Sequence, residues 1–407
     1  MALMPVAEAL ARVLAEATPL AQEPAALTDA HGRVLADDLV ALRTQPPADV
    51  SAMDGYAVHA ADVAKVPARL KLVGEVAAGH PFDGAVGIGE AARIFTGGVL
   101  PPGTDTIVIQ ENTAREGDTV VVTTSAGKGR NVRVEGLDFV RGAVLLAKGR
   151  RLSDRDLALA AAMNHPTVPV HRRPRLAVLA TGDELVMPGA TPAFGEIVYS
   201  NGYATMALAR REGCEVLDLG IAPDRLDETA AAVRRAHDLG ADILVTSGGA
   251  SVGDYDLVQK ALAAEGLALS FWKVALRPGR PMMHGRLGRS LGAMHVLGLP
   301  GNPVSAYVCA VLFLVPLIRR LTGRRDAEPV AEPALLGCDL PENDERADYL
   351  RATLAERHGG LPVATPAPVQ DSSMLTPLAA ADCLLLREPH APAAKAGAFC
   401  SIIRLAP

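Results

Sequence analysis

A chain of 407 residues is too long for one ordinary core, and its length predicts about three domains. The net charge of −6, the 3% of aromatic residues and the lack of any run of lysine and arginine disfavour nucleic acid as the main partner. The five cysteines lie far apart without a CxxC pair, which predicts neither a disulfide framework nor a zinc site and favours a cytoplasmic protein.

The first part of the chain, up to about residue 172, is predicted to mix α and β structure. Residues 1–17, MALMPVAEALARVLAEA, repeat apolar residues with helical period and include two glutamates, which predicts an amphipathic helix and not a secretion signal. Gly- and Pro-rich sequence follows, with short strands at 71–76 and 120–124. Helix returns at 152–164, where Ser153 is in position to cap the first turn.

From residue 174 to about 323, apolar strands alternate strictly with helices. Continuous apolar strands in this order predict a doubly wound, mostly parallel sheet. The predicted strands are 175–181, 215–221, 241–247 and 295–300, and the predicted helices are 201–213, 225–240, 256–266 and one that begins at Pro303.

Two further segments complete the predicted fold. The stretch 306–318 is the most apolar of the chain, and at about 13 residues it is too short to cross a bilayer, so we expect a buried helix. From about residue 327 the helical signal fades. Short strands at 349–355, 383–388 and 399–405, separated by Pro and Gly, predict a small β-barrel or sandwich.

Ligands of an open α/β sheet bind at the carboxyl ends of its strands. That rule selects the loops that follow the four predicted strands: TGDEL (181–185), APD (222–224), SGGASVGDYD (247–256) and LPGNPVS (299–305).

The loop SGGASVGDYD is suited to an anion. Its glycines Gly248, Gly249 and Gly253 let the backbone approach closely, Ser247 and Ser251 can add hydroxyl donors, and a helix N-terminus follows. A tight turn without a ligand is the alternative. The loop LPGNPVS could also bind an anion, since it has a Gly-Asn turn before a helix. The alternative interpretation of this loop is a helix start without a ligand.

A basic turn lies between the last two of these loops. Lys273, Arg277 and Arg280 surround a Pro-Gly turn, which suits an oxyanion or a phosphate. The alternative is a solvated basic hairpin.

Four acids, Glu184, Asp224, Asp254 and Asp256, fall at the same sheet edge. They would repel a phosphate unless Mg²⁺ bridges carboxylate and phosphate oxygens, and they could also serve in acid–base chemistry. Each acid taken singly is more often a helix cap.

Seven motifs occur in the order in which one family has them: SAMDGYA (51–57), FTGGVLPPGTDTIV (95–108), GRNVRVEGLDF (129–139), ATGDEL (180–185), SGGASVGD (247–254), RPGRP (277–281) and LPGNPVSA (299–306). Together they resemble the molybdopterin molybdenumtransferase family of molybdenum cofactor biosynthesis, which includes the C-terminal part of gephyrin. The resemblance runs from about residue 5 to 405.

This resemblance implies an activity and an architecture. The family inserts molybdate into adenylylated molybdopterin and releases AMP, with Mg²⁺. The implied chain is an elongated homodimer subunit, with its site between the central domain of one subunit and an inserted segment of the other. The implied domains are an N-terminal helical and linker domain (1–45 and 145–172), an inserted β-rich domain (46–144), the doubly wound domain (173–325) and a C-terminal β-barrel (326–407).

The resemblance also implies residue roles. Asp256 would act most directly on the metal and on AMP cleavage, with Glu184 and Asp224 in support as metal ligands. Asp54, Thr96 and Asp138 would reach in from the partner subunit. The implied substrate-binding residues are Thr96, Ser247, Gly248, Gly249, Ser251, Gly253, Lys273, Pro300, Gly301, Asn302 and Pro303. The implied molybdate pocket consists of Arg277, Arg280, Ser305, Arg351 and Ser372.

Some positions depart from the family pattern. Arg277 and Arg280 stand where lysine is frequent, which replaces a point charge by a planar fork. The other departures are Val50 for an asparagine, Leu137 for an acid and Asp371 for a glycine.

Two other functions stay open: a molybdopterin adenylyltransferase that uses ATP, and a non-catalytic molybdopterin-binding scaffold. We expect small-molecule substrates, an upstream adenylyltransferase and downstream molybdoenzymes as partners, and neither nucleic acid nor a membrane.

Overall fold

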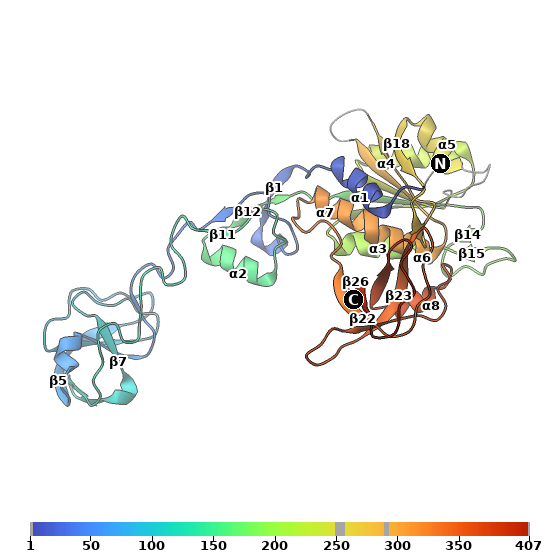
Figure 1. Ribbon diagram of the computed structural model, residues 1–407. Helices are drawn as coiled ribbons and strands as arrows, with labels where there is room; N and C mark the ends of the chain where they lie inside the picture. Colours follow the sequence, from blue (N-terminus) through green and yellow to red (C-terminus); the bar gives the residue numbers. More distant parts are fainter. Residues whose placement is uncertain (1–2, 249–256, 289–292, 406–407) are drawn as a thin grey trace.

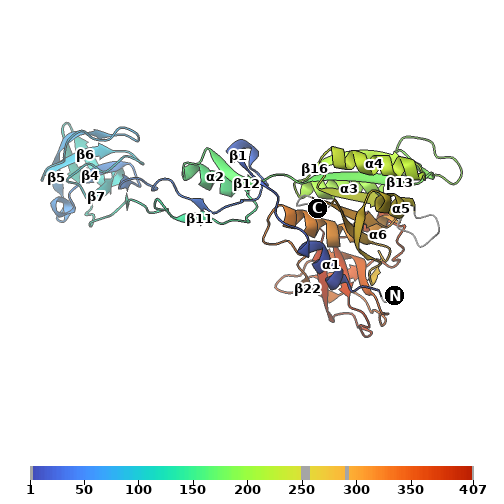
Figure 2. The ribbon, with the colours of Figure 1, turned by 90° about the horizontal axis from the view of Figure 1, so that it is seen from above.

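The computed structural model describes residues 3–248, 257–288 and 293–405. The molecule is elongated, with one six-stranded sheet at its far end and a second sheet plus a β-barrel at the other (Figure 1). A narrow middle part joins them, as the view from above also shows (Figure 2). The multidomain α/β fold predicted from the sequence is confirmed, and the predicted domain boundaries stay predictions.

The far sheet has the strand order β7-β4-β6-β5-β9-β8. Side chains alternate between its two faces, so that Tyr56 and Val108 pack in one apolar cluster and Ala57 and Ile107 in another. Its elements are β4 (Gly55–Val58), η2 (Ala60–Val63), β5 (Ala68–Val76), β6 (Glu90–Ile94), β7 (Thr106–Ile109), η3 (Gln110–Asn112), β8 (Thr113–Glu116) and β9 (Thr119–Val122). The predicted strands at 71–76 and 120–124 are therefore confirmed.

The middle part is made of chain segments from both sides of the far sheet. The antiparallel pairs are β1 (Gln22–Ala26) with β12 (Thr167–His171), β2 (Leu39–Val40) with β11 (Val144–Leu146), and β3 (Val50–Ser51) with β10 (Val132–Arg133). A 3₁₀ turn, η1 (Leu27–Asp29), and the helix α2 (Asp154–Ala162) complete it. Ser153 caps α2 as predicted, in a capping box with Asp156.

The central sheet has the order β16-β13-β17-β21-β20-β18. Its first four strands are parallel, β20 is antiparallel to its neighbour β21, and β18 is antiparallel to β20. These strands are β13 (Arg175–Thr181), β16 (Glu215–Ala222), β17 (Ile243–Ser247), β18 (Leu267–Trp272), β20 (Met283–Leu287) and β21 (Met294–Leu299). A small parallel pair, β14 (Leu185–Val186) and β15 (Ile197–Val198), lies outside it.

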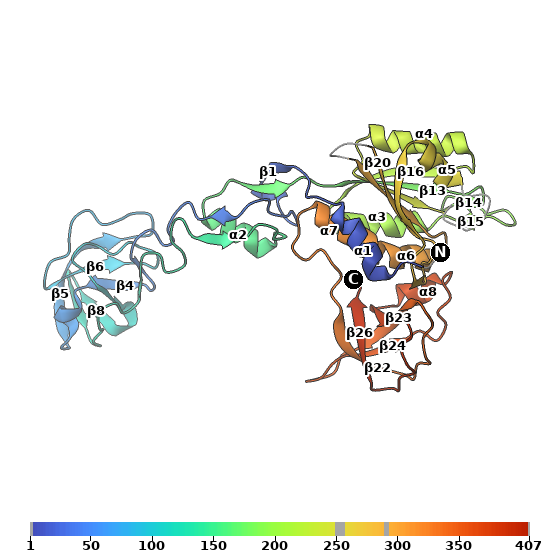
Figure 3. The ribbon, with the colours of Figure 1, turned by 45° about the horizontal axis from the view of Figure 1, so that its top comes forward.

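Helices cover both faces of the central sheet (Figure 3). The helices α1 (Val6–Ala15) and α3 (Asn201–Arg211) pack on one face with the long helix that begins at Pro303, and α4 (Leu226–Asp238) and α5 (Leu257–Ala264) pack on the other. Neighbouring strand residues take opposite faces: Leu176 and Val178 contact the first set, Ala177 and Leu179 the second. The doubly wound prediction is confirmed.

The long helix runs through α6 (Pro303–Cys309), a π-helical turn (Ala310–Leu314) and α7 (Val315–Leu321). Its 19 residues are long and apolar enough to cross a membrane by length and composition. The expectation that this segment is too short to cross a bilayer was therefore wrong. Because 83% of its most apolar window is buried inside the structure, the prediction of a buried core helix is confirmed.

The C-terminal part is a closed five-stranded barrel. It closes because β23 (Ala347–Ala355) pairs with both β24 (Val363–Pro366) and β25 (Cys383–Arg387), while β22 (Glu332–Leu336) and β26 (Phe399–Arg404) complete the circle. A short helix, α8 (Leu375–Ala379), lies between β24 and β25 in the chain. The barrel, and not the sandwich, is the correct alternative.

One strand connects the barrel to the central domain. β19 (Leu276–Arg277) comes from the basic turn of the central domain and pairs in parallel with β23, with Leu276 opposite Ala347 and Arg277 opposite Asp348. The barrel is therefore joined to the central domain by backbone pairing as well as by the chain itself.

Candidate active site at the strand ends of the central sheet

The carboxyl ends of the four parallel strands lie side by side. Thr181 pairs with Ala222, and Ser247 pairs with both Ala180 and Leu299. The four loops that were selected from the sequence therefore begin at one edge of the sheet, where the ligands of such folds bind.

Asn201, the first residue of α3, connects two of these loops. Its side-chain amide donates to the carbonyl of Gly301 at 2.7 Å and to the hydroxyl of Ser247 at 3.3 Å. Asn201 was not among the site residues predicted from the sequence. Its signal was an asparagine at the start of a predicted helix beside a strand end, a position that favours such side chains for capping. Here the amide instead bonds to the neighbouring loops.

Gly248 has a structural requirement of its own. Its φ is +95°, and a Cβ atom there would lie 2.6 Å from the carbonyl oxygen of Thr181. A glycine is needed for the turn to pack on the end of β13, whether or not the loop holds an anion. The remaining predicted residues of this loop, Gly249, Ser251, Gly253, Asp254 and Asp256, lie outside the described residues.

Two of the predicted acids face solvent at this edge. Glu184 and Asp224 are exposed, and the backbone N–H of Asp224 donates to Asp183 Oδ1 at 3.0 Å, which ties the first two loops together. Asp183 was not singled out from the sequence. Within the described ranges, no three His, Cys, Asp or Glu side chains gather as a metal-binding group.

The loop LPGNPVS meets the barrel. The side-chain amide of Asn302 donates to the Ser372 hydroxyl at 2.8 Å, and the N–H of Val304 donates to the Ser372 carbonyl at 3.0 Å. Pro303 is the first residue of α6, and the side chains of Pro300 and Ser305 are buried. Ser372 and the predicted loop are thus brought together, although 70 residues separate Asn302 from Ser372.

Arg351 is the largest fully buried side chain among the described residues, with 1% of its surface exposed. Its guanidinium donates to the Gln370 side chain at 3.0 Å and to the Asp371 carbonyl at 2.6 Å. Burial lowers the pKa of Arg351. This cation therefore arranges the segment that leads into Ser372.

The three predicted cations of the basic turn have different surroundings. Lys273 Nζ lies 4.2 Å from the centre of the Trp272 ring, a cation–π contact. Arg277 forms ion pairs with the barrel residues Asp344 and Asp348. Arg280 is exposed and has no side-chain hydrogen bond or ion pair with any residue in the described ranges. Of the three, Arg280 is the exposed cation that has neither an acidic nor an aromatic partner among those residues.

The other predicted residues lie in the far sheet or between it and the middle part. Asp54 accepts hydrogen bonds from the Thr96 N–H and hydroxyl, both at 2.8 Å, and these hold the pKa of Asp54 below its usual value. Asp138 lines a cavity of about 360 Å³ with Arg43 and Arg133. The molecule's shape separates this set from the central sheet within one chain (Figures 1 and 3).

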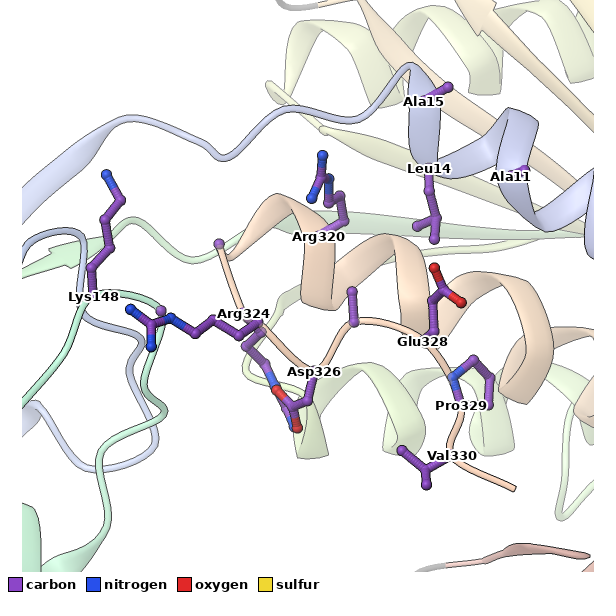
Figure 4. A pocket seen from close by; sticks show the side chains of 14 residues that line it. Ala11, Leu14, Ala15, Lys148, Arg320, Arg324, Asp326, Glu328, Pro329 and Val330 are labelled. Atoms are coloured by element: carbon purple, nitrogen blue, oxygen red, sulfur yellow. The ribbon is translucent and has the colours of Figure 1, made fainter. Parts of the chain in front are cut away.

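A larger cavity of about 800 Å³ lies at the junction with the middle part (Figure 4). It is lined by α1, the turn at Lys148 and the segment after α7, and Arg324 there pairs with Glu212 and Asp326. The cavity is at the C-terminal end of the long helix, whereas Pro303 at the N-terminal end adjoins the strand-edge loops. It contains none of the predicted site residues.

Comparisons with known proteins cover nearly the whole chain. The family model for the MoeA N-terminal region (domains I and II) matches residues 4–164, that for a probable molybdopterin-binding domain matches 177–320, and that for the MoeA C-terminal region (domain IV) matches 333–405. The molybdopterin molybdenumtransferase of Haemophilus influenzae is 33% identical over 89% of this chain and 88% of its own length. The chain belongs to the molybdopterin molybdenumtransferase family.

Other members of the family agree with this assignment. The molybdopterin molybdenumtransferase of a Nostoc species is 38% identical over 80% of this chain and 75% of its own length. A crystal structure of the MoeA protein of Pyrococcus horikoshii has a TM-score of 0.84 at 29% identity, covering 99% of each chain. The family resemblance predicted from the seven motifs is confirmed.

Proposed function

We propose that this chain inserts molybdate into adenylylated molybdopterin and releases AMP. The observation that carries the proposal is the contact of Asn302 with Ser372, because it joins the strand-edge loops to the barrel residues at one place. Membership of a family whose curated relatives are named molybdopterin molybdenumtransferase supports the same chemistry.

We assign the phosphate end of the substrate to the edge around Ser247 and Gly248. The hydroxyl of Ser247 and the N-terminal turn of α3 meet there, and unpaired N–H groups at a helix N-terminus favour anions. Asn201 orients the loops through its two hydrogen bonds and keeps the edge in one arrangement.

Glu184 and Asp224 would hold Mg²⁺, together with Asp256 outside the described residues. Both described carboxylates are exposed at neighbouring strand ends and have no ion pair with any residue of the described segments. Such a set of few hard oxygen donors suits Mg²⁺, which takes one or two carboxylates plus phosphate oxygens and waters. When bound, Mg²⁺ neutralises charge on the phosphoanhydride.

The oxyanion would bind between the basic turn and the barrel. Arg280 supplies an exposed charge, Ser372 a hydroxyl, and the buried Arg351 keeps the segment before Ser372 in place. Preorganised donors of this kind cost little reorganisation when charge develops.

We further propose that the active unit is a cytoplasmic homodimer. Asp54, Thr96 and Asp138 cannot reach the central sheet of their own chain in an elongated molecule, so a second copy would have to supply them. A symmetric pair of chains would then complete two equivalent sites.

The test is an incubation of the purified protein with adenylylated molybdopterin, Mg²⁺ and molybdate, in which AMP is measured. We expect AMP release that depends on molybdate, with molybdenum retained on the pterin. Tight binding without AMP release would instead support a scaffold, and AMP–ATP exchange on molybdopterin would support an adenylyltransferase. Omission of Mg²⁺ tests the metal requirement in the same assay.

A further inference from the structure

Arg277 is almost saturated by the barrel. Its Nε donates to Asp348 Oδ1 at 2.6 Å and its Nη2 donates to the other Asp348 oxygen, so the pair is bidentate. Its Nη1 donates to Asp344 at 2.9 Å, and its Nη2 also donates to Asn343 at 2.9 Å. Four of the five guanidinium N–H groups are therefore used.

The local acids at least match the local arginines, since Glu345 also acts electrostatically on Arg277 and Arg346. Arg346 pairs with Asp344 at 2.6 Å, so two arginines, Arg277 and Arg346, face two aspartates, Asp344 and Asp348. Asp348 is only 5% exposed, and a buried carboxylate that lost its partner would be strongly unfavourable. An incoming oxyanion would therefore meet little free positive charge at Arg277.

The ion pair is built on strand pairing between two domains. Arg277 is on β19 of the central domain, directly opposite Asp348 on β23 of the barrel, and the Ala347 N–H donates to the Ala275 carbonyl at 3.0 Å beside them. Lysine at position 277 could supply the charge but not the fork that matches a carboxylate at two points.

The same barrel strand leads to the strand-edge loops. β23 carries Asp348 and also Arg351, whose guanidinium holds Gln370 and the Asp371 carbonyl. Ser372 follows and accepts from Asn302. The seating of β23 on β19 thus determines where Ser372 lies.

We propose that Arg277 is a positioning residue and not an oxyanion ligand: with Asp348 it seats the barrel on the central domain, and Arg280 is the cation of this turn that meets the oxyanion. This inference deepens the proposed function, on which its oxyanion part rests. The seating part does not depend on it.

The experiment compares the full-length variants Arg277→Ala, Arg277→Lys, Asp348→Asn, the double variant Arg277→Ala/Asp348→Asn, and Arg280→Ala. Arg404→Ala is the matched control, because Arg404 pairs with Glu332 and Glu356 elsewhere on the barrel. Two readouts are taken: hydrogen exchange of peptides that cover 275–277 and 343–351 without substrate, and KM and kcat for molybdate in the AMP-release assay.

We expect Arg277→Ala and Asp348→Asn each to speed exchange in both peptides and to raise the molybdate KM about tenfold, with the double variant no worse than the worse single one. Arg277→Lys should rescue neither readout. Arg280→Ala should raise the KM about tenfold with normal exchange, and its effect should multiply with that of Arg277→Ala. Arg404→Ala should change neither readout.

A direct oxyanion role for Arg277 predicts a different pattern for Asp348→Asn and for the exchange data, and that pattern would overturn the proposal. Arg277→Ala would raise the KM, Asp348→Asn would lower it by releasing the cation, and exchange would stay normal in both. If the wild type releases no AMP with molybdate, the proposed function fails, and the exchange data alone still decide whether Arg277 and Asp348 seat the barrel.

Discussion

The central sheet and the far sheet bring their polar residues together in different ways. At the central sheet, parallel register places the ends of β13, β16, β17 and β21 at one edge, so loops far apart in the chain meet inside one domain. At the far sheet, Asp54 and Thr96 form a local pair that no described acid of the central sheet joins. One half of the candidate site therefore follows from topology, whereas the other half would come from a second chain if the proposed homodimer forms.

The largest expected effect comes from inactivating the two halves of the candidate site, one in each of two variants. Glu184→Gln disables the central half and Asp54→Asn the far half, and each should reduce AMP release by at least about 10²-fold. An equal mixture of the two variants, dissociated and reassociated, should recover roughly a quarter of wild-type activity, because mixed dimers hold one intact site. Activity of the mixture no higher than that of either variant would contradict a site shared between chains.

Gly248 tests how strictly the central edge is packed. Gly248→Ala should destabilise the protein by about 2 kcal/mol, because the new Cβ would meet the Thr181 carbonyl and the positive φ is strained. Gly266→Ala is the matched control: its φ is also positive, at +88°, but a Cβ there meets nothing within 4 Å. Chemical denaturation of both variants measures the difference. Equal losses would mean that backbone strain alone explains the glycine.

Asn201 tests whether the loops of the central edge are held together by side-chain bonds. Asn201→Ala removes the donor to Gly301 and Ser247 and should cost about 1 kcal/mol of stability, with a higher KM for the pterin substrate. Asn112→Ala at the far sheet is the control, since the Asn112 side chain has no hydrogen bond with a described residue. Thermal unfolding and steady-state kinetics check this prediction, and unchanged values for Asn201→Ala would refute it.

The smallest effect is expected from loss of the Thr96 hydroxyl at the far sheet. The folded pKa of Asp54 is depressed by Thr96, so its contribution is present above the pKa of the unfolded chain and is lost as pH falls through the folded pKa. Thr96→Ala removes the hydroxyl donor and should move the Asp54 pKa upward, so that this contribution is lost at a higher pH. An NMR titration of the Asp54 carboxyl measures the shift. A titration curve identical to that of the wild type would show that the hydroxyl does not act on Asp54.

The central domain is the part of the molecule that could best be predicted from the sequence. Apolar runs such as 175–181 and 241–247 form buried parallel strands in any such fold, so the edge where Glu184, Asp224, Ser247 and Asn302 gather could be predicted from strand order alone. The Ser153 cap and the buried long helix could also be predicted from the sequence. At both places the local residue pattern favours the same structure that the packing of the protein requires.

The partners of the polar side chains depend on how the domains pack against one another. Nothing in the spacing shows that Arg277 pairs with Asp348, 71 residues later, or that Asn201 connects Ser247 to Gly301. A charged side chain takes whichever partner the packing of domains brings within about 3 Å. The edge and its residue types were therefore predictable from the sequence, while the seating of the barrel determined that Arg277 is paired with acids and Arg280 is not, among the described residues.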